Sequence, residues 1–419
     1  MATFSSVLAE PRFRVLFGCR SLTIVADTLR IVALSVLIFD TTGSPLLTAL
    51  TFGIGFAPQA VGGLVFGALA DRIRPRLLIC AGYFFEFVSA SVLAFLRPPV
   101  WVMLLLIGVV ASMTPLFTGA SSRLVAEVLD GDRYVLGRSL WTMASSAAQL
   151  LGLALGGAAA AALGPQRALA VSAALHLIAC VATRLRLPDL DPPVRQATSV
   201  VRQTMRVNWV LLGDRQVRRL LLAHWLPPAF AVGAESLLVV YASTRGMPAG
   251  TGGVLLACLP VGMLVGNFLV GRVFTARLRL APMLIVLVGL PLTLFALDLN
   301  PFAAGALLVV SATGFAYALC LQRAFLDATQ PETRGQAFGL LGTGMQTLQG
   351  VGPACFGALA EVVSPGMTIA LAGVATMLTA LIQPRAAGES ASGMSTAGTP
   401  EPSAGTDQTS ARPRSRGRA

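Results

Sequence analysis

Long apolar runs, separated by short polar or Gly/Pro-rich breaks, extend along most of the chain. A helix that crosses a bilayer needs about 20 consecutive, mostly apolar residues, because the hydrocarbon core is about 30 Å thick. The pattern therefore predicts an all-α integral membrane protein. Twelve transmembrane helices are expected, at about 14–39, 46–70, 77–97, 100–122, 140–163, 167–185, 217–242, 251–274, 281–299, 302–322, 337–361 and 366–384.

The longest internal polar interruption separates six of these spans from the other six. We expect an N-terminal six-helix half (1–185), a cytoplasmic linker (186–216), a C-terminal six-helix half (217–385) and a disordered cytoplasmic tail (386–419). The halves also resemble each other, because QLLGLALGG at 149–157 and QGVGPACFG at 349–357 share a Gln and two Gly at matched positions. Two six-helix repeats in the same orientation are typical of transporters whose substrate site lies near mid-membrane.

Charge placement predicts the orientation of the spans. Charged residues make up 12% of the chain, whereas soluble domains carry roughly 25%. All 31 basic residues are Arg, and the net charge of +12 would suggest a nucleic-acid partner in a soluble chain. Here the arginines lie mainly between apolar runs, and outside the tail twenty fall on the side of the termini against three on the other. We therefore predict cytoplasmic termini, a location in the cell membrane and no nucleic-acid binding.

An ionisable side chain near mid-membrane costs at least about 2.5–3.5 kcal/mol, so each one is a candidate functional residue. In the first span Arg20, Thr23, Asp27 and Arg30 form one helical stripe. Asp27 and Arg30 either form a self-neutralising pair that only holds the helix, or Asp27 exchanges protons or contacts a cationic substrate.

Two further carboxylates lie in predicted spans. Glu235 has no Arg within four residues of it on its own helix, so it is either a coupling or substrate-contact residue or a carboxyl satisfied across the repeat interface. Because spans 1 and 7 hold equivalent places in the halves, we expect Asp27 and Glu235 to face one central cavity. Glu86 in the third span is a weaker candidate for the same pathway, and Arg123 with Glu127 is expected to be a local pair.

The loop after the second span carries a recognisable motif. GALADRIRPRLLI at 67–79 resembles the signature loop of the major facilitator superfamily, with Gly67, Asp71, Arg72 and Arg76 at matching places. The segments 22–44 and 331–353 are similar to the drug:proton antiporter branch of that superfamily, which includes actinobacterial macrolide efflux proteins. The resemblance implies secondary active export of a small molecule driven by proton entry, with no cofactor, no metal and the lipid bilayer as its surroundings. We expect a monomer.

The same resemblance implies a conformational gate at this loop. Asp71 would lie against the positive N-terminal end of helix 11 while Arg72 and Arg76 pair across to the other half, and all three would bias the equilibrium between two states. The alternative is a plain topology anchor. The matching loop of the second half has Thr275 where Asp71 stands, so the acidic residue is specific to one half.

The fifth span is similar in part to the antiporter signature. Gly152, Gly156 and Gly157 are retained, and small residues at these spacings also let helices pack closely without any transport role. Gln149 lies on a face of this span from which it could contact an amphipathic substrate.

Other functions stay open at this level. A same-fold importer, or a carrier of a sugar, peptide or siderophore, is the alternative within transport. A membrane enzyme is disfavoured because the chain has only two histidines, no metal-ligand cluster, and no GxSxG or phosphate-loop motif. A scaffold without transport would leave the intramembrane carboxylates unexplained.

Overall fold

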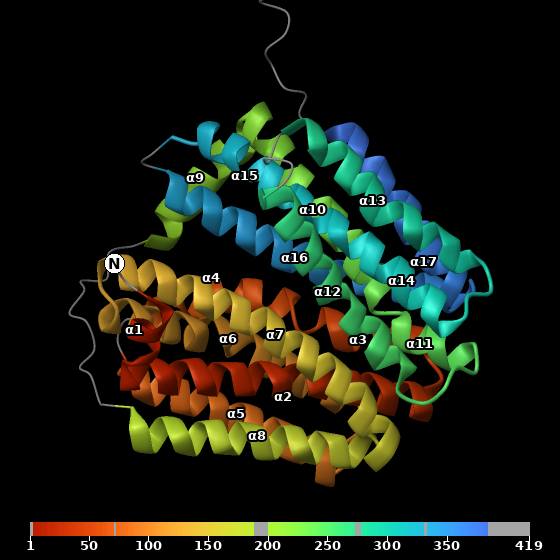
Figure 1. Ribbon diagram of the computed structural model, residues 1–419, viewed down its shortest axis with the longest axis horizontal. Helices are drawn as coiled ribbons and strands as arrows, with labels where there is room; N and C mark the ends of the chain where they lie inside the picture. Colours follow the sequence, from red (N-terminus) through yellow and green to blue (C-terminus); the bar gives the residue numbers. More distant parts are fainter. Residues whose placement is uncertain (1–2, 71–72, 188–199, 273–277, 331–332, 384–419) are drawn as a thin grey trace, which may run out of the picture. The chain divides into compact units, whose positions relative to one another are not determined.

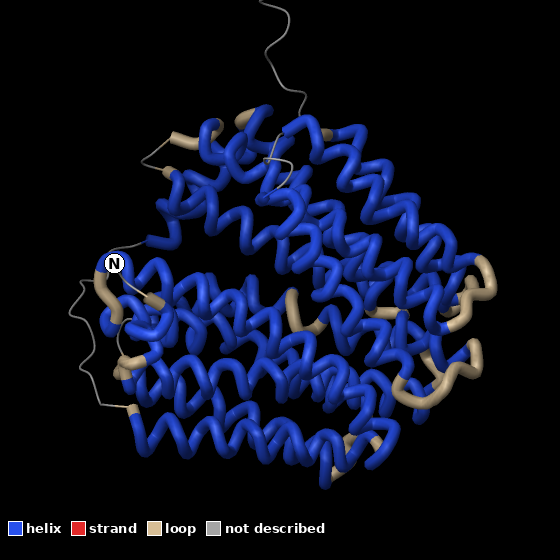
Figure 2. The backbone as a smooth tube through the Cα atoms, viewed as in Figure 1, coloured by secondary structure: helices blue, strands red, loops and turns tan. Residues whose placement is uncertain are grey.

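The fold was obtained as a computed structural model, and it describes residues 3–70, 73–187, 200–272, 278–330 and 333–383. The described residues fold into helices joined by short loops and turns (Figures 1 and 2). The first half contains α1 Phe4–Leu8, α2 Pro11–Thr42, α3 Pro45–Gly53, α4 Ala57–Ala70, α5 Pro75–Phe95, α6 Val100–Val128, α7 Gly131–Leu163 and α8 Pro165–Arg186.

The second half repeats this plan with more interruptions. Its helices are α9 Val200–Gly213, α10 Arg215–Glu235, α11 Leu238–Thr244, α12 Thr251–Arg272, α13 Ala281–Thr293, α14 Pro301–Thr313, α15 Tyr317–Asp327, α16 Arg334–Ala360 and α17 Pro365–Leu378. Short 3₁₀ turns extend α13, link α14 to α15 and follow α17. The helix α9 lies inside the segment predicted to be a linker.

Among the described residues, ten helices are long and apolar enough to cross a membrane. Two of the twelve predicted spans are not among the ten: the helix at Ala281–Ala296 is apolar but shorter, and α16 carries several polar residues. The prediction of a helical membrane protein is confirmed, and the count of twelve spans stays a prediction.

Local sequence signals explain where these helices begin and end. Pro45 and Pro365 each occupy the first turn of a helix, where a missing N–H costs nothing, and the preceding Ser44 and Ser364 cap the same helices with their hydroxyls. Gly43 ends α2 in a left-handed conformation (φ 64°), which a residue with a side chain adopts only at a cost.

The two halves have the same pattern of neighbouring helices. In the first half α2 packs against α7 and α8, α5 against α8, and α4 against α6. In the second half α10 packs against α16 and α17, α13 against α17, and α12 against α14. The neighbour relations of these helices therefore repeat in order along the chain.

The halves meet where α3 packs on α16 and where α7 packs on α12. Figure 1 shows α3, α12 and α16 at this junction. Glycines allow the close approach: a Cβ on Gly157 would lie 2.6 Å from the Gly250 carbonyl, and a Cβ on Gly53 would lie 2.6 Å from the Gly350 carbonyl. A side chain at either position would push the two halves apart.

Polar contacts also join the halves. Glu361, at the C-terminal end of α16, accepts hydrogen bonds from the Ser44 hydroxyl and from the Leu46 amide (3.0 Å) at the start of α3. A carboxylate suits this position, because the first N–H groups of a helix carry partial positive charge. Deeper along the junction, Gln346 donates to Gln59 at 3.1 Å.

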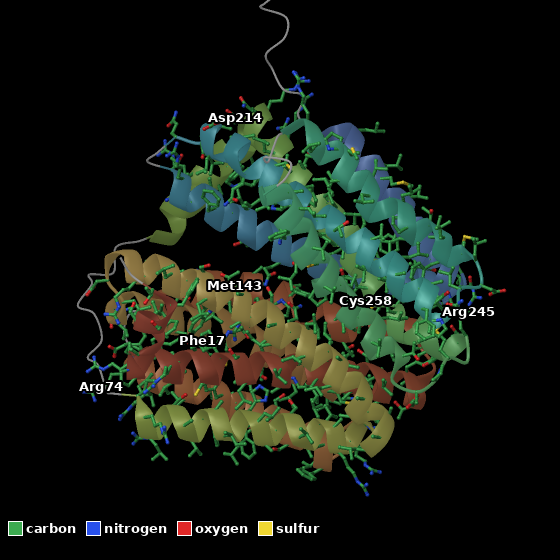
Figure 3. The ribbon with its side chains drawn as sticks, viewed as in Figure 1. Phe17, Arg74, Met143, Asp214, Arg245 and Cys258 are labelled. Carbon is green, nitrogen blue, oxygen red and sulfur yellow. The ribbon has the colours of Figure 1, made fainter. Side chains whose placement is uncertain are left out.

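The loops of the two halves lie at both ends of the helices. Figure 3 shows Arg74, which precedes α5, and Arg245, which follows α11, at opposite ends of the helices.

Candidate functional site

A cavity of about 270 Å³ lies within the first half. Its lining residues come from α2, α3, α4, α5, α6 and α8 and from the break between α3 and α4 at Gly55. One part of the wall is apolar, with side chains such as Leu34, Ile107 and Phe117, and the other part is polar and charged. A compartment with both kinds of wall fits an amphipathic small molecule.

The polar wall is built mainly by α2. Arg20, Thr23, Asp27 and Arg30 all line the cavity, so the stripe predicted from their spacing is confirmed. The spacing works because residues three and four positions apart stand on the same face of a helix. The opposite face of α2 packs against α7, where Gly152 leaves room for Val25 and Thr28.

Arg30 holds two carboxylates at once. Its guanidinium donates to Asp27 on the same helix at 3.2 Å and to Glu86 on α5. The Arg30 side chain is 9% exposed and Glu86 is 15% exposed, whereas Asp27 is 31% exposed and faces the cavity. The planar guanidinium can serve two acceptors in fixed directions, which a lysine could not do as well. Glu86, the weaker candidate in the sequence, therefore belongs to the cavity wall.

His176 completes this group, and sequence reasoning did not identify it. It is fully buried on α8, with Nε2 at 3.1 Å from Asp27 Oδ1 and Nδ1 at 2.9 Å from the Ser172 carbonyl. Ser172 in turn donates from its hydroxyl to the Ala26 carbonyl at 2.8 Å, which fixes α8 against α2. The sequence does contain one signal for it. His176 is a lone histidine inside an apolar predicted span, and an ionisable residue inside a membrane span is a candidate functional residue.

The same side chains resemble a metal site in composition. The ligand atoms of Asp27, Glu86 and His176 lie within 4.8 Å of one another. However, the Arg30 guanidinium already contacts both carboxylates, so a metal ion would have to displace it. The group is therefore better described as an ion-pair network than as a metal site.

Glu235 lies elsewhere. It ends α10 and lines a small void of about 10 Å³ together with residues of α10, α12, α13 and α14 such as Leu259, Leu292 and Leu308. Its surroundings are apolar apart from Ser311. The expectation that Asp27 and Glu235 face one cavity is wrong for this conformation, because α2 and α10 direct these carboxylates into separate spaces within their own halves.

Comparison with known proteins supplies the family. The model of the Major Facilitator Superfamily matches residues 16–329, which is well over half of the chain. The chain belongs to the Major Facilitator Superfamily. No curated protein sequence matches it significantly.

Solved structures with the superfamily fold cover most of the chain. A bacterial homologue of the human lysosomal transporter Spinster, in an inward-facing and unoccupied conformation, aligns with TM-score 0.66 at 14% identity, over 88% of this chain and 94% of its own. A mutant of the nucleoside transporter NupG aligns with TM-score 0.69 at 14% identity, over 88% and 98%. A POT family transporter in complex with 5-aminolevulinic acid aligns with TM-score 0.69 at 10% identity, over 88% and 94%. At these identities the likeness concerns the fold alone, and it is the family match that favours a membrane transporter over an enzyme.

Within this superfamily fold, the glycines of the fifth predicted span lie at two close contacts. Gly152 and Gly156 face α2, and Gly157 faces Gly250 and Gly253 of the other half. These positions show a packing role directly, and any further role of the partial antiporter signature stays a prediction. Gln149, one turn earlier, is exposed and does not line the cavity.

The signature loop of the superfamily is only partly described. Gly67 belongs to α4, whereas Asp71 and Arg72 lie outside the described residues, so the gate stays a prediction. Arg76 donates to the Leu187 carbonyl of the same half at 3.1 Å. Arg123 and Glu127 form the predicted local pair at 2.8 Å.

Proposed function

We propose that this chain is a proton-coupled exporter of a hydrophobic or amphipathic small molecule, which it moves across the cell membrane by alternating access. In this proposal twelve spans form two six-helix repeats, and both termini are cytoplasmic. The transporter acts as a monomer, with no cofactor other than the proton gradient.

The observation that carries the proposal is the cavity of the first half. It combines an apolar wall with a buried network in which the Arg30 guanidinium contacts both Asp27 and Glu86. Buried ion pairs stabilise a protein poorly compared with apolar packing, so a network kept at this depth favours a role in transport. Asp27 is the carboxylate of the network with the largest exposure to the cavity, so we assign proton coupling to this half.

Alternating access would require the contacts between the halves to break and reform. Glu361 with Ser44 and Leu46, together with the glycine contacts of α7 and α12, closes one end of the junction. With the proposed orientation this is the extracellular end, and the signature loop around Asp71 would close the cytoplasmic end. In this proposal only one end of the junction is closed at a time, so the transport cycle has one state open to the cytoplasm and one open to the outside.

Export is favoured over import by the resemblance of segments 22–44 and 331–353 to drug:proton antiporters and by the retained glycines of the fifth span. The alternative is a same-fold importer or a carrier of a sugar, peptide or siderophore. A membrane enzyme or a scaffold is disfavoured by the family.

The experiment is an accumulation assay in a host that lacks its own drug exporters. Cells that produce the protein should retain less ethidium and less erythromycin than cells with an empty vector. A protonophore should abolish the difference. Higher retention in the producing cells would indicate import, and a difference that survives the protonophore would reject proton coupling.

A further inference from the structure

We propose that Asp27 and His176 hold one exchangeable proton between them, and that this pair is the proton-binding site of the cavity. The inference deepens the proposed function and rests on it for its physiological meaning. The geometry that carries it is independent of which molecule is transported.

The first step concerns Nδ1 of His176. This atom lies 2.9 Å from the Ser172 carbonyl oxygen. A carbonyl oxygen can only accept a hydrogen bond, so Nδ1 carries a hydrogen and donates it. In a neutral imidazole the other nitrogen, Nε2, is then an acceptor with a lone pair.

The second step concerns the partner of that lone pair. Nε2 lies 3.1 Å from Asp27 Oδ1. An ionised carboxylate is also an acceptor only, so two lone pairs would face each other at hydrogen-bond distance. The contact becomes favourable when one proton lies between the two atoms, on His176 as imidazolium or on Asp27 as carboxylic acid.

The charges around the pair include Arg20 as well as Arg30. Arg30 contacts both Asp27 and Glu86, and Arg20 on α2 and Tyr83 on α5 are the other described titratable groups that line the cavity. With Arg20 and Arg30 both counted, the cavity is neutral without the proton and carries one positive charge with it. The charge balance therefore allows the proton to leave, and the hydrogen-bond geometry carries the inference.

The positions of the two side chains define how the proton is reached. His176 is fully buried, whereas Asp27 is 31% exposed to the cavity. A proton therefore enters and leaves through Asp27, and His176 holds it away from water. Loss of the proton leaves Asp27 facing the Nε2 lone pair, so a basic group of a substrate that donates to Asp27 can take its place. The site thus favours basic amphipathic compounds.

The chain contains its own control. His224, on α10, is the other of the two histidines and makes the same contact, from Nδ1 to the Leu220 carbonyl four residues earlier at 2.9 Å. Its ring packs edge-on against Phe325, with ring centroids 5.9 Å apart, and no carboxylate contact of His224 occurs among the described residues. The shared proton requires Asp27, so it belongs to His176 alone.

Two histidines make a direct test possible. The full-length protein, purified with a histidine-free affinity tag and labelled with ¹⁵N in the histidine rings, should give two sets of ring signals by NMR. His224→Gln assigns them. We expect the His176 ring to carry a hydrogen on Nδ1, and its Nε2 signal in the native protein to differ from that in Asp27→Asn. In Asp27→Asn the side-chain amide can donate to the Nε2 lone pair, so no shared proton is needed there.

A different tautomer would overturn the inference. If His176 carries its hydrogen on Nε2 at every pH and donates it to an ionised Asp27, no proton is shared. Equal Nε2 signals in the native protein and in Asp27→Asn would also reject the pair. A third outcome would also overturn it. If Zn²⁺ or Mn²⁺ raises the thermal-unfolding midpoint of the native protein but not that of His176→Gln, the site binds a metal ion instead of a proton.

A transport experiment distinguishes failure of this inference from failure of the proposed function. In proteoliposomes, His176→Gln should lower ethidium transport driven by a pH gradient about tenfold, the effect of losing a hydrogen bond to a charged group. Ethidium exchange without a gradient should fall by a smaller factor, because exchange requires no net movement of protons. His224→Gln should behave as the native protein in both assays. Full gradient-driven transport by His176→Gln would contradict the proton site, whereas a native protein that ignores the gradient would contradict the proposed function and leave the NMR result intact.

Discussion

The two halves of the molecule share a fold and differ in chemistry. The first half encloses a cavity of about 270 Å³ in which Arg30, Asp27, Glu86 and His176 form one connected network. The second half, with the same pattern of helix neighbours, has Glu235 in an apolar void of about 10 Å³. Duplication of the helix arrangement therefore has not duplicated the site.

The difference indicates a division of labour between the halves. In the first half Arg20 and Arg30 face Asp27 and Glu86 in one cavity, so the positive and negative charges balance there. In the second half, no basic side chain is among the described residues that line the void around Glu235. We infer that the first half carries the proton-coupling residues. The second half then serves as a scaffold relative to which the first half moves during transport.

The largest effect is expected from Arg30→Ala. Removal of one partner from a buried ion-pair network leaves uncompensated charge and costs roughly 3–5 kcal/mol of folding free energy. The midpoint of thermal unfolding in detergent should fall accordingly, and transport should be lost. As a matched control, the triple variant Arg30→Ala, Asp27→Asn and Glu86→Gln should regain most of the stability without regaining transport. A single variant as stable as the native protein would show that the network is not buried as described.

The next effect concerns the contact between the halves. In Gly157→Val the added side chain would collide with Gly250, just before α12, and with Gly253 on α12, and overpacking of this kind costs roughly 1–3 kcal/mol. Distances between spin labels on the two halves should increase at this end. Gly119→Ala is the control, because a Cβ at Gly119 meets nothing within 4 Å. Unchanged distances in Gly157→Val would contradict the close glycine packing.

A smaller effect is expected at the polar contact of the same junction. In Glu361→Gln the carboxylate that receives Ser44 and Leu46 is replaced by a neutral amide. Glu361 is exposed, so the loss should be about 1 kcal/mol or less, seen as a modest population shift in the same label distances. The shift should shrink as salt is added. A change that is independent of salt would argue against an electrostatic contact at the start of α3.

The smallest effect is expected from Glu235→Gln. Because glutamine resembles the neutral acid in size and polarity, transport should stay within about twofold of the native value, a cost well below 1 kcal/mol. The rate of ethidium transport at several pH values measures this. If the transport rate of Glu235→Gln no longer depends on pH, the second half and not the first carries the proton coupling.

Much of the fold follows from the sequence, because apolar runs of membrane-spanning length and Pro or Ser at helix starts are local signals. The breaks after Gly53 and Glu235 were not predicted, since each interrupts a run that stays apolar throughout. The gate could not be tested, because Asp71 and Arg72 lie outside the described residues.

The site was only partly predictable. The stripe on α2 is a matter of helical spacing within one segment, so Asp27 and Arg30 could be found. Their partners Glu86 and His176 come from α5 and α8, and spacing along the chain does not specify how these helices rotate about their axes. The error about Asp27 and Glu235 has the same origin, since equivalence between repeats gives the helix but not the space into which its side chains extend.

The most direct test of the central claim compares Asp27→Asn with Glu235→Gln in proteoliposomes under an imposed pH gradient, with ethidium as the probe. The account predicts that Asp27→Asn loses gradient-driven transport, and that Glu235→Gln transports as the native protein does. Gradient-driven transport that survives in Asp27→Asn and is lost in Glu235→Gln would contradict it.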